Sequence, residues 1–173
     1  MRNRNIAIVS IIALCIWIAY LFISFTGLFD GDAIEYAEIG RNIFQGKGFY
    51  TNSLFPIRLP FTHKAPFPSL RRPPFLPLLL AGSFSLFGVS DMSVVFVTGL
   101  FFILTIPVIY VLSLKMFERK DVAILSSLLY AFNNTAIFYS TAGITETTFA
   151  FLITLSVLFI FKRTSPIFIF SAG

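Results

Sequence analysis

The sequence predicts an all-α, polytopic membrane protein, and both its composition and its apolar runs support this prediction. Hydrophobic residues make up 57% of the 173 residues and charged residues only 12%, whereas soluble domains carry about 25% charge. The mean hydropathy is +0.86, and several apolar runs approach the roughly 20 residues that a helix needs to cross a bilayer. The net charge of +5 comes from scattered residues that form no basic tract, so we expect no nucleic-acid partner.

The first predicted span covers residues 6–27 and begins just after Arg2 and Arg4. These arginines place the N-terminus in the cytoplasm, because basic flanks favour that side. A cleaved signal peptide is the alternative, but the apolar run is long for one and residues 24–27 form a poor cleavage site. We therefore expect a retained anchor with an external segment after it.

Three further spans are predicted at residues 93–115, 122–142 and 145–161. The first of these ends in the basic stretch 115–120, and the last ends in the basic pair 162–163. Both stretches then fall in the cytoplasm, as positive-inside bias requires. This gives about four transmembrane helices in a cell membrane.

The external loop covers residues 28–91, and interfacial helices are predicted in it over residues 33–45 and 73–88. The second helix would measure about 24 Å, which is short of the roughly 30 Å hydrocarbon core. Prolines also crowd its first turn. If it crossed instead, the later basic stretches would lie outside, and this short span stays the alternative. Because loops this long are usually functional, we expect the chemistry here.

The last predicted element is a partial fifth helix that opens at Pro166. Its remaining residues are too few to cross a bilayer. We therefore expect residues 1–173 to form a single membrane domain and to be an incomplete N-terminal part of a longer protein.

The helix predicted over residues 33–45 is amphipathic, and we expect it to lie flat on the external surface. Its apolar face carries Tyr36, Ile39 and Ile43. The opposite, polar face carries Glu35, Glu38, Asn42 and Gln45.

Two acids, Asp30 and Asp32, follow the first span directly. A carboxylate near hydrocarbon costs free energy, so acids at this boundary are candidate functional residues. A carboxylate at a helix N-terminus is held ionised and oriented, which suits one that accepts a proton from a hydroxyl. We favour Asp32 for this role, with Asp30 as the competing candidate. However, Asp32 followed by Glu35 also fits a capping box, so a structural role stays open.

Glu146 opens the last, short span. Because the span is short, Glu146 is expected slightly below the outer headgroups of the membrane. An acid at such a depth normally faces a water-filled cavity rather than lipid. The alternative is an acid favoured by the helix dipole, with Thr145 as cap. Arg71 and Arg72 directly precede the second interfacial helix, and guanidinium forks match phosphate oxygens. Attraction to lipid headgroups is the alternative there.

No cluster of histidine, cysteine and acidic residues predicts a zinc site. The triplet Asp30-Gly31-Asp32 matches a metal-nucleotide DxD pattern, but three residues are a weak signal. We expect no required cofactor, and a divalent metal is not indicated.

The order of these elements resembles the N-terminal part of GT-C fold glycosyltransferases. It is most similar to the protein O-mannosyltransferase-like and lipid A aminoarabinose transferase-like group, which use polyprenyl-phosphate sugars. The resemblance covers nearly the whole chain and lies in the order of elements. The matching segments are the Asp32-x-x-x-Tyr-Ala-Glu-Ile helix, Gly46-Lys-Gly-Phe, Arg72-Pro-Pro-x-x-Pro-Leu-Leu-Leu, Leu86-Phe-Gly and Thr145-Glu146. Family members continue through more spans, and the Asp30-Gly31-Asp32 spelling leaves the choice of acid open.

By this resemblance, Asp32 matches the first-loop catalytic aspartate, Glu146 the second acid of the cavity, and Arg72 a basic residue near the lipid phosphate. The implied reaction is inverting transfer from a polyprenyl-phosphate sugar to a lipid, glycan or protein hydroxyl outside the membrane. Asp32 accepts the hydroxyl proton, Glu146 orients the acceptor or assists the base, and Arg71 or Arg72 stabilises the leaving phosphate. We also expect substrate contacts from Asp30, Tyr36 and Lys64.

Two other classes of protein stay open. A fragment of a secondary transporter or channel would place its acids near the membrane midplane, whereas the acids here gather at the outer boundary. A non-catalytic membrane partner would share the fold without activity of its own.

Overall fold

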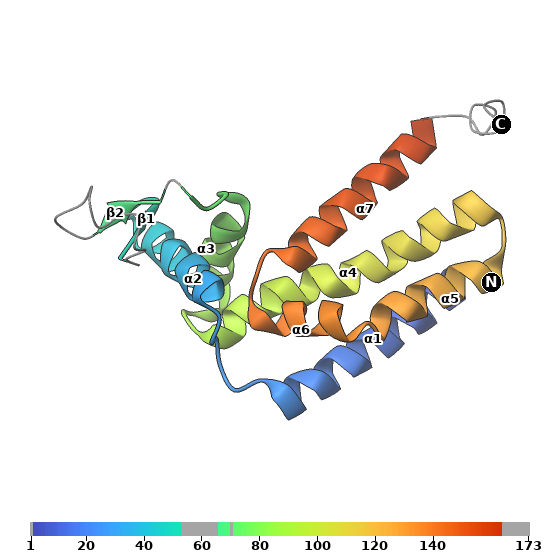
Figure 1. Cartoon of the computed structure of the whole chain (residues 1–173), viewed down its shortest axis with the longest axis horizontal. Coiled ribbons are helices and arrows are strands. Elements are labelled where there is room, and N and C mark those ends of the chain that lie inside the picture. The colour runs from blue at the N-terminus through green and yellow to red at the C-terminus, as the bar shows by residue number, and fades with distance from the viewer. Residues whose placement is uncertain (1, 53–65, 70, 164–173) are drawn as a thin grey trace. The chain divides into compact units, whose positions relative to one another are not determined.

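The structure is a computed structural model that describes residues 2–52, 66–69 and 71–163. Lys64 and the residues after Pro166 lie outside the described part. Figure 1 shows helices and one short strand pair, which confirms the predicted all-α class. The elements are α1 (Arg2–Ser24), α2 (Gly31–Phe44), β1 (Tyr50–Thr51), β2 (Phe67–Pro68), α3 (Phe75–Phe87), α4 (Asp91–Phe117), α5 (Lys120–Ala131), α6 (Asn134–Ala142) and α7 (Glu146–Arg163).

Two of the described helices are long and apolar enough to cross a membrane, namely α1 over Arg4–Ser24 and α4 over Asp91–Phe117. A third span is possible if α5 and α6 are taken together, but they are bent by 51°. The apolar part of α7, Glu146–Phe161, is shorter than a typical span, as is α3. The first two predicted spans are therefore found as continuous helices, while the third is broken and the fourth is short.

The break between α5 and α6 has a local cause at Asn133. Its side-chain oxygen accepts a hydrogen bond from the Ala136 backbone N–H at 2.9 Å. This is the geometry of an N-cap, which starts a new helix and satisfies one of its first donors. The predicted continuous span over residues 122–142 is thus interrupted by a polar cap within an apolar run.

The chain divides into two compact units. The first, which we call the bundle unit, comprises the described residues 2–25, 99–141 and 146–163. Its buried apolar cluster is formed by Val9, Ala13, Ile106, Tyr110, Ala123 and Ala131. Gly99 permits the closest approach in it, because a Cβ there would lie 2.1 Å from the Trp17 ring. Within this unit α4 and α1 therefore pack at a distance that only glycine allows.

The second unit, which we call the loop unit, comprises the described residues 26–52, 66–69, 71–98 and 142–145. Its central feature is the packing of α2 against α3. A Cβ at Gly40 of α2 would lie 2.8 Å from the Leu80 Cβ of α3, so the two helices nearly touch at that point. The antiparallel strands pair Tyr50 with Pro68 and Thr51 with Phe67. This pairing returns the chain beside α2 just before Arg71 and Arg72.

Candidate functional site

The N-terminus of α2 is capped by Asp30. Its side chain accepts hydrogen bonds from the backbone N–H groups of Asp32 at 2.8 Å and Ala33 at 3.4 Å. The interpretation of Asp32 as the cap is therefore wrong, because the helix begins at Gly31 and the capping residue, Asp30, lies two residues earlier than the sequence suggested. Asp32 lies in the first turn, and its carboxylate is left for contacts outside the helix.

Those contacts come from the segment that precedes α3. An Arg72 Nη2 donates to Asp32 Oδ1, and Arg72 Nε donates to Glu35 Oε2 at 2.5 Å. The Arg72 guanidinium carbon lies 4.9 Å from the centre of the Tyr36 ring, within the range of a cation–π contact. Arg71 Nη2 lies 3.4 Å from Asp32 Oδ1. We call these five residues the Arg72 cluster.

The cluster follows from helix spacing and from the packing of the loop unit. Asp32, Glu35 and Tyr36 are separated by three and four residues, so they share one face of α2. The β1–β2 pair and the α2–α3 contact bring the residues before α3 to that face. Four predicted site residues, Asp32, Tyr36, Arg71 and Arg72, are thereby brought together, although the two residues on α2 lie far in sequence from the two arginines.

The two carboxylates of the cluster differ in exposure. The Asp32 side chain is 48% exposed and that of Arg71 is 46% exposed, whereas Arg72 is 7% exposed and Glu35 is fully buried. Arg72 therefore meets a buried carboxylate through Nε and an accessible carboxylate through Nη2.

The contact between Asp32 and Arg72 favours the ionised form of both side chains. The hydrogen bond from Arg72 is the main cause that lowers the pKa of the Asp32 carboxyl; the charges of Arg72 and Arg71 add to it and burial opposes it. Asp32 in turn is the main cause that raises the pKa of Arg72, with Glu35 adding to it. In this state the lowered pKa favours the ionised form of Asp32, which is a hydrogen-bond acceptor but a weak base.

The polar face of α2 is covered rather than exposed. Asn42 Nδ2 donates to the Tyr50 carbonyl at 2.8 Å, and Glu38 accepts hydrogen bonds from Thr51 and Asn52. Glu35 lies on the same face, against Arg72. Glu38 and Asn42 share a polar side of α2 as predicted, and the strand segment covers them. The predicted separation of Glu35 from Tyr36 is wrong, because Arg72 contacts both side chains.

Sequence reasoning did not assign Glu35 to the site. The pair Asp32 and Glu35 was interpreted as a capping box, which explained the spacing without a partner. The same spacing also places two carboxylates on one helix face. This signal could have indicated that a positively charged side chain, here Arg72, binds between them.

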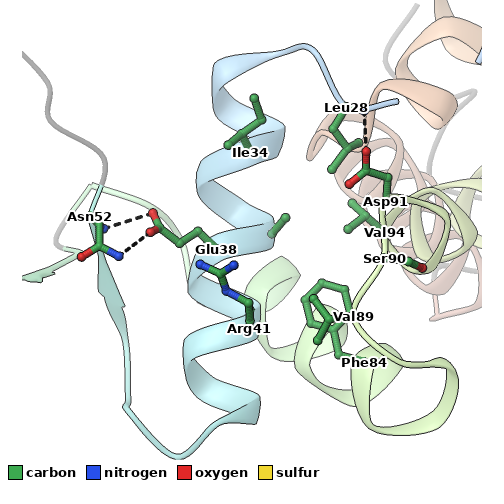
Figure 2. Close-up of a pocket in the computed structure, with 11 residues that line it drawn as sticks. Leu28, Ile34, Glu38, Arg41, Asn52, Phe84, Val89, Ser90, Asp91 and Val94 are labelled. Atoms are coloured by element: carbon green, nitrogen blue, oxygen red, sulfur yellow. Dashed lines mark hydrogen bonds between the residues drawn. The ribbon is translucent and has the colours of Figure 1, made fainter. Parts of the chain in front are cut away.

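A pocket of about 490 Å³ lies on the side of α2 that faces away from the Arg72 cluster. Figure 2 shows Glu38 and Asn52 joined at one end and Asp91 at the other. Asp91 accepts a hydrogen bond from the Leu28 backbone N–H at 3.1 Å. The wall of this pocket is largely apolar, and the residues of the Arg72 cluster do not line the pocket. The lining residues that Figure 2 labels are Leu28, Ile34, Glu38, Arg41, Asn52, Phe84, Val89, Ser90, Asp91 and Val94.

Glu146 belongs to the bundle unit, where it is the first residue of α7 and is exposed. It borders a pocket of about 200 Å³ together with Tyr130, Asn133 and Tyr139. Its role as a second acid stays a prediction.

The comparison with known families decides the class. A family model described as dolichyl-phosphate-mannose-protein mannosyltransferase matches residues 71–165, which is more than half of the chain. The chain belongs to this family. Neither the curated proteins nor the solved structures include a match. The predicted resemblance to membrane mannosyltransferases is thereby confirmed, and a glycosyltransferase is favoured over a transporter.

The mannosyltransferase match includes Arg71, Arg72 and Glu146, while Asp32 and Glu35 precede it. The part of the chain that the structure describes holds no group of three or more His, Cys, Asp or Glu side chains placed to bind a metal ion. In the Asp30-Gly31-Asp32 triplet, one carboxylate caps α2 and the other faces arginines. The two side chains thus have different partners.

Proposed function

We propose that the chain transfers a sugar from a polyprenyl-phosphate donor to a hydroxyl acceptor on the external face of the membrane. The observation that carries this proposal is the contact of an accessible carboxylate, Asp32, with two arginines, in a member of a mannosyltransferase family. The proposed base, Asp32, would then lie in direct contact with the arginines proposed to bind the phosphate.

The chemistry is a direct displacement. The acceptor hydroxyl oxygen attacks the anomeric carbon, the bond from that carbon to the phosphate oxygen breaks, and its electron pair leaves with the lipid phosphate. Asp32 takes the hydroxyl proton, a contribution of about 10²–10⁴-fold in such reactions. Arg71 and Arg72 stabilise the charge that develops on the phosphate. A single displacement inverts the anomeric configuration.

The remaining predicted residues have supporting roles in this proposal. Asp30 fixes the start of α2 through its cap, and Tyr36 contacts the Arg72 guanidinium through a cation–π interaction. Glu146 orients the acceptor, and Lys64 contacts the donor phosphate. The external position of the loop unit is supported by the basic residues at the N-terminus and at the end of α4, which favour the cytoplasm.

The test is transfer of radiolabelled sugar in membranes that contain the chain, with a panel of polyprenyl-phosphate sugars as donors and with membranes lacking the chain as the control. We expect a labelled product whose anomeric configuration, determined by NMR, is opposite to that of the donor. A product with retained configuration would contradict the single displacement, and the absence of transfer across the panel would contradict the function.

A further inference from the structure

We propose that the donor phosphate displaces Asp32 from Arg72, while Glu35 acts as the positioning residue that holds Arg72 in place during the exchange. This inference rests on the proposed function, because it concerns how the same site takes up its donor.

The charge of the cluster supports an exchange rather than simple addition. Among its described members, the two guanidinium groups of Arg71 and Arg72 face the two carboxylates of Asp32 and Glu35. The two positive and two negative charges of this group balance. A phosphate that approached Arg72 would find its guanidinium already bound to the carboxylates of Asp32 and Glu35. One anion must therefore give way.

Exposure indicates which anion gives way. Asp32 is 48% exposed, so its carboxylate can turn into water when it leaves Arg72. Glu35 is fully buried, and a buried charge that loses its partner is strongly destabilised. The exchangeable partner is thus Asp32, and the permanent partner is Glu35.

The geometry of Arg72 permits this division. Its Nε donates to Glu35, its Nη2 donates to Asp32, and its guanidinium carbon lies over the Tyr36 ring, 4.9 Å from the ring centre. Arginine offers five N–H donors in a rigid fork, so one edge can change its partner while the other edge stays bound. A lysine lacks this rigid fork, because its three donors share one freely rotating ammonium.

The exchange has a consequence for catalysis. The hydrogen bond from Arg72 is the main cause of the lowered pKa of Asp32, so its removal by phosphate makes Asp32 a stronger base. The base is then activated only when the donor is bound.

The experiment measures binding of a polyprenyl monophosphate to the purified chain in neutral-lipid nanodiscs. We expect Asp32→Asn to bind it about tenfold more tightly, because the competing anion is gone, and Glu35→Gln to bind it about tenfold more weakly. Both variants remove one negative charge, so an unspecific charge effect would tighten binding in both. Asp121→Asn serves as control, since it removes an aspartate that pairs with Arg119 in an exposed position elsewhere.

A double-mutant cycle assigns the effect to Arg72. In an Arg72→Ala background, Asp32→Asn should give no further gain in affinity. Because Glu35→Gln alters a buried group, its helical content and melting temperature are measured beside its affinity, and the Asp32 and Arg72 variants test the exchange independently of its folding. Equal affinity of the wild type and Asp32→Asn would overturn the exchange while leaving the proposed function intact. A chain that binds no polyprenyl phosphate in any variant would instead contradict the proposed function.

Discussion

At the start of α2, Asp30 and Asp32 lie two residues apart and differ in their contacts. Asp30 accepts two backbone hydrogen bonds and is committed to the helix, whereas Asp32 faces two arginines and is half exposed. A side chain that fixes a helix start cannot also reach freely toward a substrate. This division favours Asp32 as the residue that meets the acceptor hydroxyl.

The lowered pKa of Asp32 gives a prediction for the pH profile of transfer. Among the described residues, the charged groups near it are Arg71 and Arg72 on the segment before α3, Glu35 on α2 and Asp30, which caps that helix. Because Arg72 lowers the pKa below its ordinary value of 3.8, Asp32 in the free enzyme stays ionised as the pH falls to that value and is protonated only below it. We expect kcat/KM for the donor to show no inflection from Asp32 between about pH 4 and about pH 6.

The matched variant for this profile is Arg72→Lys, which keeps a positive charge but loses the fork. It should move the acid limb of kcat/KM toward higher pH, because Asp32 loses its strongest stabilising contact. An identical acid limb in both proteins would show that Asp32 does not titrate through Arg72.

At the scale of elements, the site depends on how closely α2 and α3 approach. At Gly40 a Cβ would lie 2.8 Å from the Leu80 Cβ and 3.2 Å from the Pro77 carbonyl oxygen. Backbone atoms cannot yield as a flexible side chain can. The position of Arg72, three residues before α3, is therefore tied to the absence of a side chain at residue 40.

Gly40→Ala should push the helices apart and lower the free energy of unfolding by about 1–3 kcal/mol, with a loss of transfer. Thermal unfolding of the purified chain measures the first effect, and transfer assays measure the second. Gly82→Ala is the matched control, because a Cβ at this α3 position meets nothing within 4 Å; it should raise stability by about 0.5–1 kcal/mol. A stabilised Gly40→Ala protein would contradict the tight contact.

The elements themselves were predictable to different degrees. Helices expected over residues 33–45 and 73–88 are found as Gly31–Phe44 and Phe75–Phe87, because amphipathic spacing and prolines mark them in sequence. Their interfacial position stays a prediction. The third span was predicted as continuous, since hydropathy averages over many residues. The hydropathy pattern therefore did not indicate the cap at Asn133, which divides α5 from α6.

At the scale of the whole molecule, the fold class was predictable because composition alone excludes a soluble domain. The candidate site was predictable only in part. Asp32, Tyr36, Arg71 and Arg72 were singled out by chemistry and by resemblance, yet their mutual contact depends on tertiary packing. The burial of Glu35 could not be predicted, since periodicity tells which residues share a face but not what covers it.

The membrane topology gives a separate prediction. If residues 73–88 form an interfacial helix, Asn52 lies outside the cell and Glu118, at the basic end of α4, lies inside. In a chain whose Cys15 is replaced by Ser, Asn52→Cys should react with a membrane-impermeant maleimide in intact cells, and Glu118→Cys only after the cells are opened. Labelling of Glu118→Cys in intact cells would show that residues 73–88 cross the membrane.

The most direct test of the central claim is the rate of sugar transfer from a polyprenyl-phosphate donor by the wild type, Asp32→Asn and Asp30→Asn, with Asp121→Asn as control. We predict that Asp32→Asn loses about 10²–10⁴-fold in kcat, while Asp30→Asn stays close to the wild type because asparagine caps a helix about as well as aspartate. Unchanged transfer by Asp32→Asn, or a comparable loss in Asp30→Asn alone, would contradict the assignment of Asp32 as the base.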